Sequence, residues 1–359
     1  MDPRALASDY MRFAKFEGPA RYSLATSGVA DADLADLAAV LGDLDLHGPN
    51  ADGYRPLIER VADRFGVDPS SVVMPGGGCS FANHLAMAAL VAPGDEAILE
   101  TPTYELMAST LAFHQARIHR VERRPDEDWR LAPARFAAAM TPATRLVAVT
   151  NLHNPSSAEA DDAAIHALCA AAGSAGAVVL VDEVYREMTF GPGEARTAFR
   201  PELPIVVTSS LTKAYGLSGL RCGWILAPPA LAERMRRLND LFGVHPPHVA
   251  ERLAVVAFDR LEAMRARAQA IVEENRAAYR EILGGCPRLD QKIFPSGATV
   301  FPRLLQGDVD ALFAQLKSEA ETTFAPGRFF GAPDRLRIGL GGRPQPTRIG
   351  LERLASALA

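Results

Sequence analysis

Apolar positions across the middle of the chain form short runs, and these runs alternate with stretches of helical periodicity. The runs predict strands at residues 71–74, 97–100, 146–150, 177–181, 205–208 and 224–226. Helices are predicted between them, among them residues 81–91 and 161–172. Strands that alternate with helices in this way are typical of an α/β sheet covered by helices.

The pattern changes after about residue 248. A charged, amphipathic stretch, "EAMRARAQAIVEENRAAYREIL", predicts a long helix that ends at Gly284 and Gly285. A chain of 359 residues also exceeds the usual size of one domain. We therefore expect a large domain over residues 45–247 and a smaller domain formed by residues 1–44 and 248–359.

Composition narrows the choice of partners and compartment. Hydrophobic residues make up 48% of the chain and charged residues 23%, which is enough to build a globular core. The net charge of −5, without a long basic block, argues against nucleic acid or an anionic membrane as a partner. No apolar run has the roughly 18 residues that span a membrane, and the first residues lack a signal-peptide core. Because Cys79, Cys169, Cys222 and Cys286 form no CxxC pair, we expect reduced thiols, a cytoplasmic location and no metal site.

The first candidate for chemistry is Lys213, in the stretch "SSLTKAYGLSGLRCGW" that begins directly after the predicted strand 205–208. Ser210 precedes it by three positions and Arg221 follows it by eight. Most lysines are solvated surface residues, but a lysine amine that loses hydration is a nucleophile toward carbonyl groups. The surroundings of Lys213 therefore favour Schiff-base chemistry and a cofactor with a carbonyl group.

A glycine loop, "PGGGCSFANHLAM", follows the first predicted strand and opens a helix. Free backbone N–H groups and the helix dipole make such a start an anion site, although a simple tight turn explains the glycines equally well. The loop is no dinucleotide-binding motif, because the third glycine after Gly76 and Gly78 is replaced by Phe81. This departure argues against a nicotinamide enzyme.

Polar or aromatic residues follow three more predicted strands. Tyr104, in "ETPTYE", either stacks on a flat cofactor or packs as an ordinary half-buried aromatic. Asn154, in "NLHNPSS", offers an amide to a ligand, and Asn-Pro is also a common turn. Asp182, in "VVLVDEVYREM", ends a strongly apolar strand three residues before Tyr185. A buried carboxylate needs a cationic or proton-donating partner, and helix capping is the alternative.

Together these motifs resemble the fold-type I, pyridoxal 5′-phosphate (PLP)-dependent aminotransferases of class I/II. The similarity covers nearly the whole chain and follows the family's order: Gly28, the glycine loop, PTY, HNP, D-x-x-Y, S-x-x-K with an arginine eight residues later, and a late arginine in "RLRIGL". It implies a large domain with a mostly parallel central sheet flanked by helices, and a smaller α+β domain built from both termini. It also implies PLP as the cofactor and a homodimer.

The resemblance assigns roles residue by residue. Lys213 would form the Schiff base with PLP and then move protons as general base and general acid. Asp182 would keep the pyridine nitrogen protonated, Tyr185 and Asn154 would hydrogen-bond the phenolic oxygen, and Tyr104 would stack on the ring. The expected catalytic residues are Lys213, Asp182 and Tyr185.

The same resemblance places the two anionic groups of the site. The substrate α-carboxylate would bind Arg337 in "DRLRIGL", whose planar guanidinium suits a bidentate contact, beside Asn154 and Gly28. The cofactor phosphate would bind Gly78, Cys79, Ser80, Ser210 and Arg221.

Three positions depart from the family pattern. Ser157 replaces the glycine of "HNP[ST]G", and Cys79 occupies a phosphate-loop position that usually carries a small hydroxylic residue. Many relatives have a tyrosine that reaches the cofactor phosphate of the neighbouring subunit, where this chain has "DLHGPNADGY". His47 is the nearest candidate there, Tyr54 is the alternative in a longer register, and a solvated surface histidine explains His47 as well.

The expected function is transfer of an amino group between an L-amino acid and a 2-oxo acid. A β-lyase or a decarboxylase of the same fold is the alternative, and a non-catalytic effector domain is disfavoured because the cofactor set is complete. We expect a neutral or aromatic amino acid, since residues 239–251 contain no arginine for a second carboxylate and offer Phe242, His245 and His248. Arg12 or Arg21, folded over the site, would reverse that expectation.

Overall fold

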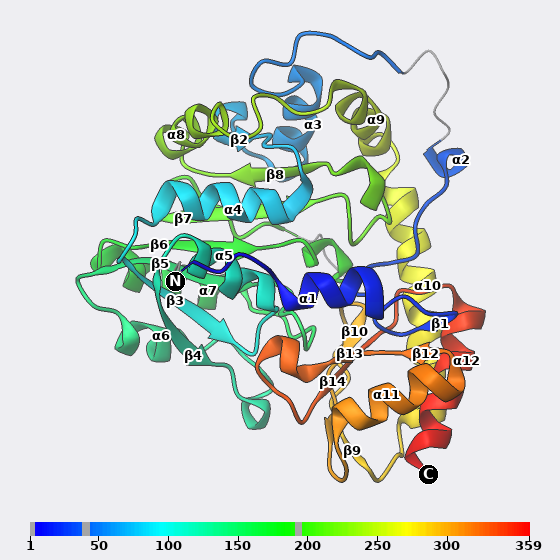
Figure 1. The fold of residues 1–359 in the computed structure, drawn as a ribbon. Coiled ribbons are helices and arrows are strands. Elements are labelled where there is room, and N and C mark those ends of the chain that lie inside the picture. Colours follow the sequence, from blue (N-terminus) through cyan, green and yellow to red (C-terminus); the bar gives the residue numbers. More distant parts are fainter. Residues whose placement is uncertain (1–3, 38–43, 191–195) are drawn as a thin grey trace.

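A seven-stranded sheet forms the centre of the structure, a computed structural model that describes residues 4–37, 44–190 and 196–359 (Figure 1). The strand order is β2-β8-β7-β6-β5-β3-β4. Strands β3 to β7 run parallel to one another, whereas β8 is antiparallel to both β7 and β2. The strands are β2 (Val72–Val73), β3 (Glu96–Thr101), β4 (Arg117–Glu122), β5 (Thr144–Thr150), β6 (Val178–Asp182), β7 (Ile205–Ser210) and β8 (Gly223–Leu226).

The six predicted strands are present, and the predicted α/β fold class is confirmed. The sequence did not predict β4, whose sequence "RIHRVE" carries only Ile118 and Val121 as apolar residues. This strand lies at the edge of the sheet and pairs with β3 alone, so most of its side chains are exposed. An edge strand of this kind lacks the continuous apolar run of a buried parallel strand.

Helices cover both faces of the sheet (Figure 1). Successive side chains of a strand point to opposite faces, and β5 shows the consequence. Val147 and Val149 pack into one core, with α3 (Arg55–Phe65), α6 (Pro133–Ala139), α7 (Asp162–Ser174) and α9 (His248–Phe258). Leu146 and Ala148 pack into the other, with α4 (Gly78–Leu90), α5 (Glu105–Phe113) and α8 (Pro229–Asn239).

The two ends of the chain pack together. A third core joins Tyr10, Phe13 and Leu24 to apolar residues of the last 80 positions, such as Phe324 and Leu354. Its elements are α1 (Asp9–Arg12), a π-helical turn (Phe13–Glu17), β1 (Tyr22–Ser23), α10 (Leu261–Leu283), β9 (Leu289–Asp290), β10 (Thr299–Val300), β11 (Arg303–Leu304), α11 (Val309–Ala320), β12 (Thr322–Thr323), β13 (Ala325–Pro326), β14 (Leu336–Gly339) and α12 (Pro344–Leu358). A short α2 (Leu34–Leu37) precedes residues 38–43, which lie outside the description.

The long helix expected after residue 248 is present, whereas the domain boundaries remain untested. The predicted long helix is α10, which ends at Leu283 with Gly284 as its C-cap. The domain boundaries near residues 44 and 247 stay a prediction, and residues 1–3 and 38–43 of the expected small domain lie outside the described residues. Within the described ranges, no helix is both long and apolar enough to cross a membrane. The cytoplasmic location stays a prediction.

Candidate active site

A cavity of about 180 Å³ lies where the carboxyl ends of β5, β6 and β7 meet. Parallel strands bring their carboxyl ends to one edge, which is where ligands bind in open α/β sheets. Every residue predicted to bind the cofactor lines this cavity except Gly78. The lining comprises Tyr10, Met11, Ala14, Ser27, Cys79, Ser80, Tyr104, Thr150, Asn154, Asp182, Val184, Tyr185, Ser210, Thr212, Lys213 and Arg221. A wider hollow of about 950 Å³ beside α3 contains no predicted site residue, so volume alone does not locate the chemistry.

The amine of Lys213 is half-buried and donates a hydrogen bond of 3.0 Å to Ser27 Oγ. The N-terminal segment is held against this lysine by a second bond, from Val29 N–H to the Lys213 carbonyl at 3.0 Å. A Cβ atom on Gly28 would lie 3.2 Å from Lys213 Cδ and 3.3 Å from its Cα. Glycine at position 28 therefore permits the close approach of the two segments.

Asp182 is the last residue of β6 and is 3% exposed. Its Oδ1 accepts hydrogen bonds from Val184 N–H at 3.0 Å and Cys79 Sγ at 3.4 Å, and its Oδ2 accepts one from Asn83 Nδ2 at 2.7 Å. Burial raises the pKa of the Asp182 carboxyl, and these bonds and the charge of Lys213 oppose the rise. Such a carboxylate favours a cation placed in the cavity.

Asn83 is a site residue that the sequence did not reveal. It lies on α4, and its Oδ1 accepts a hydrogen bond of 2.6 Å from Thr208 Oγ1 on β7. Thr208 stands opposite Asp182 in the sheet register, so three elements converge on one carboxylate. The only hint in the sequence was a polar residue five positions after Gly78, where α4 begins. A single polar residue in a helix does not indicate a site unless the fold is known.

One end of the cavity is suited to an anion. Helix α4 begins at Gly78, whose φ of +75° favours glycine, and its first backbone N–H groups have no partner within the helix. Arg221 Nη2 donates to Gly77 O at 2.8 Å and would lie 2.9 Å from a Cβ on Gly78. Ser210 is buried at the end of β7, and Ser80 is exposed.

Cys79 lies differently from the hydroxylic residue it replaces. Its thiol points to Asp182, so only its backbone N–H is left for the anion end. Burial raises the pKa of this thiol well above its usual range, and the Asp182 carboxylate raises it further. The thiol therefore stays protonated and acts as a weak donor.

Arg337, on β14, is fully buried; it does not line the cavity itself but contacts Asn154 and Tyr10, which do. Its Nη1 donates to Asn154 Oδ1 at 3.1 Å, and its Nη2 donates to Tyr10 Oη at 3.0 Å and to Ala25 O at 3.1 Å. Its Nε is buried and finds no hydrogen-bond partner among the described residues. A buried guanidinium N–H without a partner is the kind of donor that a ligand carboxylate satisfies.

Tyr10 is a second site residue that the sequence did not reveal. It lies on the four-residue helix α1, and its phenol contacts Arg337 across 327 positions of the chain. Burial raises the pKa of this phenol, but the positive charges of Arg337 and Lys213 outweigh burial and bring the pKa below its usual value. The ring packs edge-on against Tyr104 at 5.7 Å, so the two tyrosines form one wall of the cavity.

Tyr185 and Tyr104, two further predicted site residues, also line the cavity, whereas Gly28 does not. Tyr185 is buried just after β6, and Tyr104 caps the start of α5. Ser157, which replaces a glycine, adopts a left-handed φ of +68°. Its Oγ lies 2.9 Å from Thr299 O and 2.8 Å from Thr299 Oγ1, which stabilises a conformation that glycine would adopt freely.

Some expected residues do not line this cavity. His47, Phe242 and His245 are exposed, and His248 is buried against the Tyr54 ring. Residues 239–251 therefore do not line this cavity within one chain, and their part in substrate binding stays a prediction. Tyr10 and Met11 of α1 and Ala14 of the π-helical turn line the cavity instead.

Neither N-terminal arginine reaches the site. Arg12 is exposed, and Arg21 pairs with Glu321 at 3.5 Å on the surface. Met11 of α1 and Ala14 of the following π-helical turn line the cavity, whereas Arg12 does not.

Comparison with known proteins agrees with this site. The family model described as "Aminotransferase class I and II" matches residues 36–354. Capreomycidine synthase of Streptomyces vinaceus is 30% identical over 99% of this chain and 93% of its own length. Arginine–pyruvate transaminase of Pseudomonas aeruginosa is 28% identical over 87% of this chain and 82% of its own.

A PLP-dependent aminotransferase from Streptococcus suis has the same fold, with a TM-score of 0.88 at 23% identity over 97% of this chain and 96% of its own. The expected fold, cofactor and enzyme class are confirmed by these matches. The chain belongs to the family of class I and II aminotransferases and depends on pyridoxal 5′-phosphate.

Proposed function

We propose that this enzyme moves an amino group between a neutral or aromatic L-amino acid and a 2-oxo acid, with Lys213 as the nucleophile and proton carrier. The observation that carries the proposal is the cavity lined by Lys213, Asp182 and Asn154, with Arg337 bound to the Asn154 amide behind that lining. Amine, buried carboxylate and guanidinium at one strand edge are the groups that an amino-acid substrate and its cofactor require.

The residues present fit PLP. The α4 N-terminus, Ser80, Ser210 and Arg221 form a site for a phosphate, and the buried Asp182 lacks the cation that a protonated pyridine nitrogen supplies. When bound, the cofactor supplies an aldehyde for Schiff-base formation and a ring that withdraws electrons from the substrate α-carbon. Tyr185 and Asn154 would donate to its phenolic oxygen, and Tyr104 would lie against its ring.

Lys213 acts twice in this proposal. Its amine would hold the cofactor by its aldehyde, and the free amine would take the proton from the substrate α-carbon. The bond to Ser27 and the close packing at Gly28 keep the lysine stem directed into the cavity. Asp182 accepts hydrogen bonds on both oxygens, which favour its charged form, and it would hold a protonated ring nitrogen.

Arg337 would orient the substrate by its α-carboxylate. The Arg337 Nε, which has no hydrogen-bond partner among the described residues, is the donor left for the substrate carboxylate. The contacts with Asn154 and Tyr10 fix the plane of the guanidinium. Correct orientation places the α-carbon hydrogen within reach of the Lys213 amine, which is the positioning part of catalysis.

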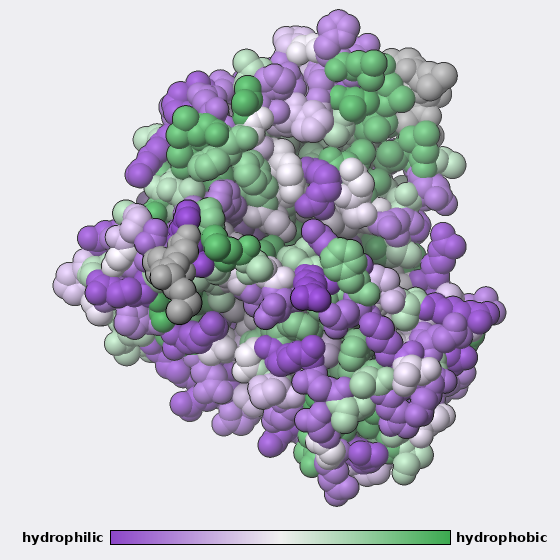
Figure 2. Space-filling model, in the orientation of Figure 1, coloured by the Kyte–Doolittle hydropathy of each residue, from purple (hydrophilic) through white to green (hydrophobic). Residues whose placement is uncertain are grey.

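A homodimer is the second part of the proposal. Leu46, Leu241 and Val244 are more than half exposed, and Phe242 packs against the His84 ring of α4 at 5.4 Å. Figure 2 shows apolar surface over α8 and α9, which suits contact with a second copy. We assign the cross-subunit contact with the cofactor phosphate to His47, which is exposed, whereas Tyr54 is half-buried and bound to Arg252. Light scattering that finds a fully active monomer contradicts this part.

One observation favours a second candidate function. The relative that is 30% identical over 99% of the chain is named a synthase, not a transaminase. The same cavity residues would serve a β-lyase or a decarboxylase, which differ in the bond aligned for cleavage rather than in the groups that hold the cofactor.

A half-reaction screen separates these functions. The holoenzyme is mixed with one amino acid at a time, without an acceptor, and the bound cofactor is identified by absorbance and mass. Amino transfer converts it to the pyridoxamine form, and a 2-oxo acid then restores PLP. Release of ammonia with pyruvate, or of carbon dioxide, with PLP unchanged would support the alternative instead.

A further inference from the structure

A fully buried ion pair lies beneath the active-site cavity and has no part in the chemistry described above. Glu100, on β3, is 0% exposed, and Arg123, just after β4, is 1% exposed. Arg123 Nη1 lies 3.1 Å from Glu100 Oε2. Burial raises the pKa of Glu100 and lowers that of Arg123, and each charge opposes the effect on the other. Apolar residues of the same volume often stabilise a core as well as a buried ion pair does. Stability alone therefore does not explain this pair, which points to a specific role.

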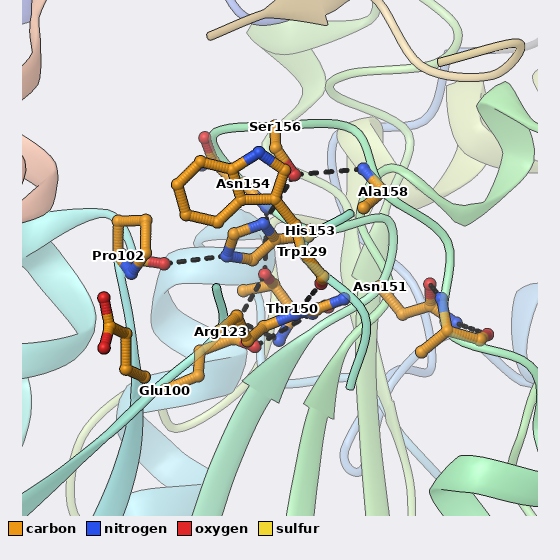
Figure 3. Close-up of polar contacts among 12 residues, drawn as sticks. Glu100, Pro102, Arg123, Trp129, Thr150, Asn151, His153, Asn154, Ser156 and Ala158 are labelled. Carbon is orange, nitrogen blue, oxygen red and sulfur yellow. Dashed lines mark hydrogen bonds and ion pairs between the residues drawn. The ribbon is translucent and has the colours of Figure 1, made fainter. Parts of the chain in front are cut away.

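The other oxygen of Glu100 leads to the cavity. Glu100 Oε1 accepts two hydrogen bonds of 2.6 Å, one from Thr150 N–H and one from Thr150 Oγ1 (Figure 3). A carboxylate only accepts, so the Thr150 hydroxyl proton is committed to Glu100. The lone pairs of that hydroxyl are then free to accept, and Asn154 N–H donates to Thr150 Oγ1 at 3.0 Å.

Asn154 completes the connection to the substrate site. Its Oδ1 accepts from Arg337 Nη1 at 3.1 Å, and the side chain lines the cavity. Since the oxygen of the amide is engaged by Arg337, the amino group of the amide is the part left to donate into the cavity. The charge on Glu100 thus sets the direction of each bond from the core to Asn154.

A second set of contacts holds the other side of the same loop. His153 Nε2 lies 2.7 Å from Pro102 O, and a carbonyl only accepts, so this nitrogen carries the proton. Its Nδ1 then accepts from Ser156 Oγ at 2.6 Å, and Ser156 Oγ accepts from Ala158 N–H at 3.2 Å (Figure 3). Burial, together with the Arg123 charge, lowers the pKa of His153 well below its usual value, so the ring stays neutral.

We propose that Glu100 and Arg123 are positioning residues for Asn154, which they aim at the cofactor through the Thr150 hydroxyl. The inference rests on the proposed role of Asn154 at the phenolic oxygen. The charge of Arg123 opposes the rise that burial causes in the pKa of Glu100. Arg123 also donates to Trp129 O at 2.5 Å and to Thr150 O at 3.4 Å, so it links the loop after β4 to the end of β5. Without the charge on Glu100, the Thr150 hydroxyl is free to rotate its proton toward Asn154 N–H, which opposes the contact.

The test compares Thr150→Val, which keeps the shape and removes the hydroxyl, with Thr150→Ser, which keeps the hydroxyl. The readouts are the pH midpoint of the bound cofactor's absorbance, KM against kcat for the amino acid, and Tm. A donor at the phenolic oxygen withdraws charge that otherwise holds a proton on the Lys213 nitrogen, so a misaimed Asn154 raises the midpoint. We expect Thr150→Val to raise the midpoint and to raise KM about tenfold, the loss of roughly one hydrogen bond, and Thr150→Ser to restore both.

A double variant, Glu100→Gln with Arg123→Met, removes both charges and leaves none unpaired. Neither side chain lines the cavity, so a raised midpoint in this variant would be transmitted through Thr150 and Asn154. The proposal is overturned if the valine and serine variants share one midpoint, or if the variants lower Tm and leave the midpoint at the wild-type value. Wild-type protein that binds no PLP on Lys213 would refute the proposed function itself, which is a distinct result.

Discussion

The Asn83 amide donates a 2.7 Å hydrogen bond to Asp182 Oδ2 and accepts a 2.6 Å bond from the Thr208 hydroxyl. A carboxylate only accepts, so the amino group of the amide must face Asp182 and the Thr208 hydroxyl must donate. All three side chains are at most 3% exposed, and water does not compete for these bonds. Asn83 therefore fixes both the rotamer and the charge of the carboxylate proposed to face the cofactor ring.

Replacing Asn83 with leucine is expected to slow removal of the substrate α-proton about 10- to 100-fold, or ~1.4–2.7 kcal/mol of barrier. The variant leaves one oxygen of Asp182 and the Thr208 hydroxyl without partners, so the carboxylate loses its fixed position. Single-turnover absorbance at saturating amino acid measures the step. Thr208→Ser, which keeps the hydroxyl, is the matched control, and a leucine variant as fast as wild type would contradict the role of Asn83.

Asp182→Asn tests the electronic part of the site. Asparagine keeps the volume and removes the negative charge opposite the ring nitrogen, so the α-proton is removed at least about 100-fold more slowly, or ~2.7 kcal/mol. Circular dichroism and Tm should remain close to wild type, because burial favours a neutral group at this position. An unchanged single-turnover rate is incompatible with the proposed role.

Lys213→Ala should abolish turnover, with a loss of about 10²–10⁴-fold or more from the missing proton carrier alone. The cavity still offers the phosphate site and Asp182, so the variant should bind PLP without a covalent bond. Borohydride treatment of the wild type, followed by peptide mass spectrometry, should label the one peptide that contains Lys213. A label on another lysine assigns the cofactor elsewhere.

The site residues that follow buried strands could be predicted from the sequence. An apolar run indicates the strand, and the polar residues after the run lie at its carboxyl end. Lys213, Asp182 and Asn154 were found in this way, and the structure brings all three to one cavity. Asn83 and Tyr10 were not found, since each owes its place to a partner far along the chain. Asn83 meets Asp182 across 99 positions, and Tyr10 meets Arg337 across 327.

The missed parts of the fold have a similar cause. Strand β4 is held by pairing with β3 at the sheet edge and not by an apolar run of its own. Helix α1 has four residues, too few for a periodic pattern, and it is positioned by the packing of Tyr10 and Phe13 on Phe329. Elements fixed by tertiary contacts leave little trace in local sequence.

Glu251 gives the protein a measurable pH dependence of stability. It is 3% exposed on α9, and burial raises its pKa to about 7 against the bonds from Asn50 and Tyr54 N–H. The unfolded value is ~4.3, so the folded chain holds the proton more tightly. The resulting stability is complete below ~4.3 and is lost as the pH rises through about 7.

Glu251→Gln removes this titration and keeps the shape of the side chain. The variant should be more stable than wild type at pH 8 by about 1–3 kcal/mol, and the difference should fade toward pH 4.5. Urea unfolding at several pH values measures it. Glu183 is buried as well, with a pKa raised to about 7, so the comparison must be between variant and wild type at each pH. A difference that stays constant with pH would show that Glu251 does not titrate in this range.

The expected substrate preference follows from the cavity wall formed by α1 and the π-helical turn that follows it. Met11 and Ala14 face the cavity there, whereas Arg12 is exposed and Arg21 pairs with Glu321. Among the described residues that line the cavity, the cations are Lys213 and Arg221, and both have assigned tasks. A side-chain carboxylate would therefore be buried without a cationic partner, which is costly. We expect kcat/KM for neutral and aromatic amino acids to exceed that for aspartate and glutamate at least about tenfold with one common acceptor, or ~1.4 kcal/mol.

Placing a cation at position 11 tests this expectation directly, because it should create activity toward an acidic amino acid. Met11→Arg introduces a guanidinium at the cavity wall, so it should raise kcat/KM for glutamate and lower it for leucine or phenylalanine, whereas Met11→Leu should leave the ranking as in wild type. The two variants change the same position, and only one changes its charge, so a shift seen in both would reflect altered packing of α1. Wild-type enzyme that prefers aspartate or glutamate as the amino donor would overturn the neutral-substrate proposal, because a cation outside this wall, such as one from a second subunit, would then have to bind the distal carboxylate.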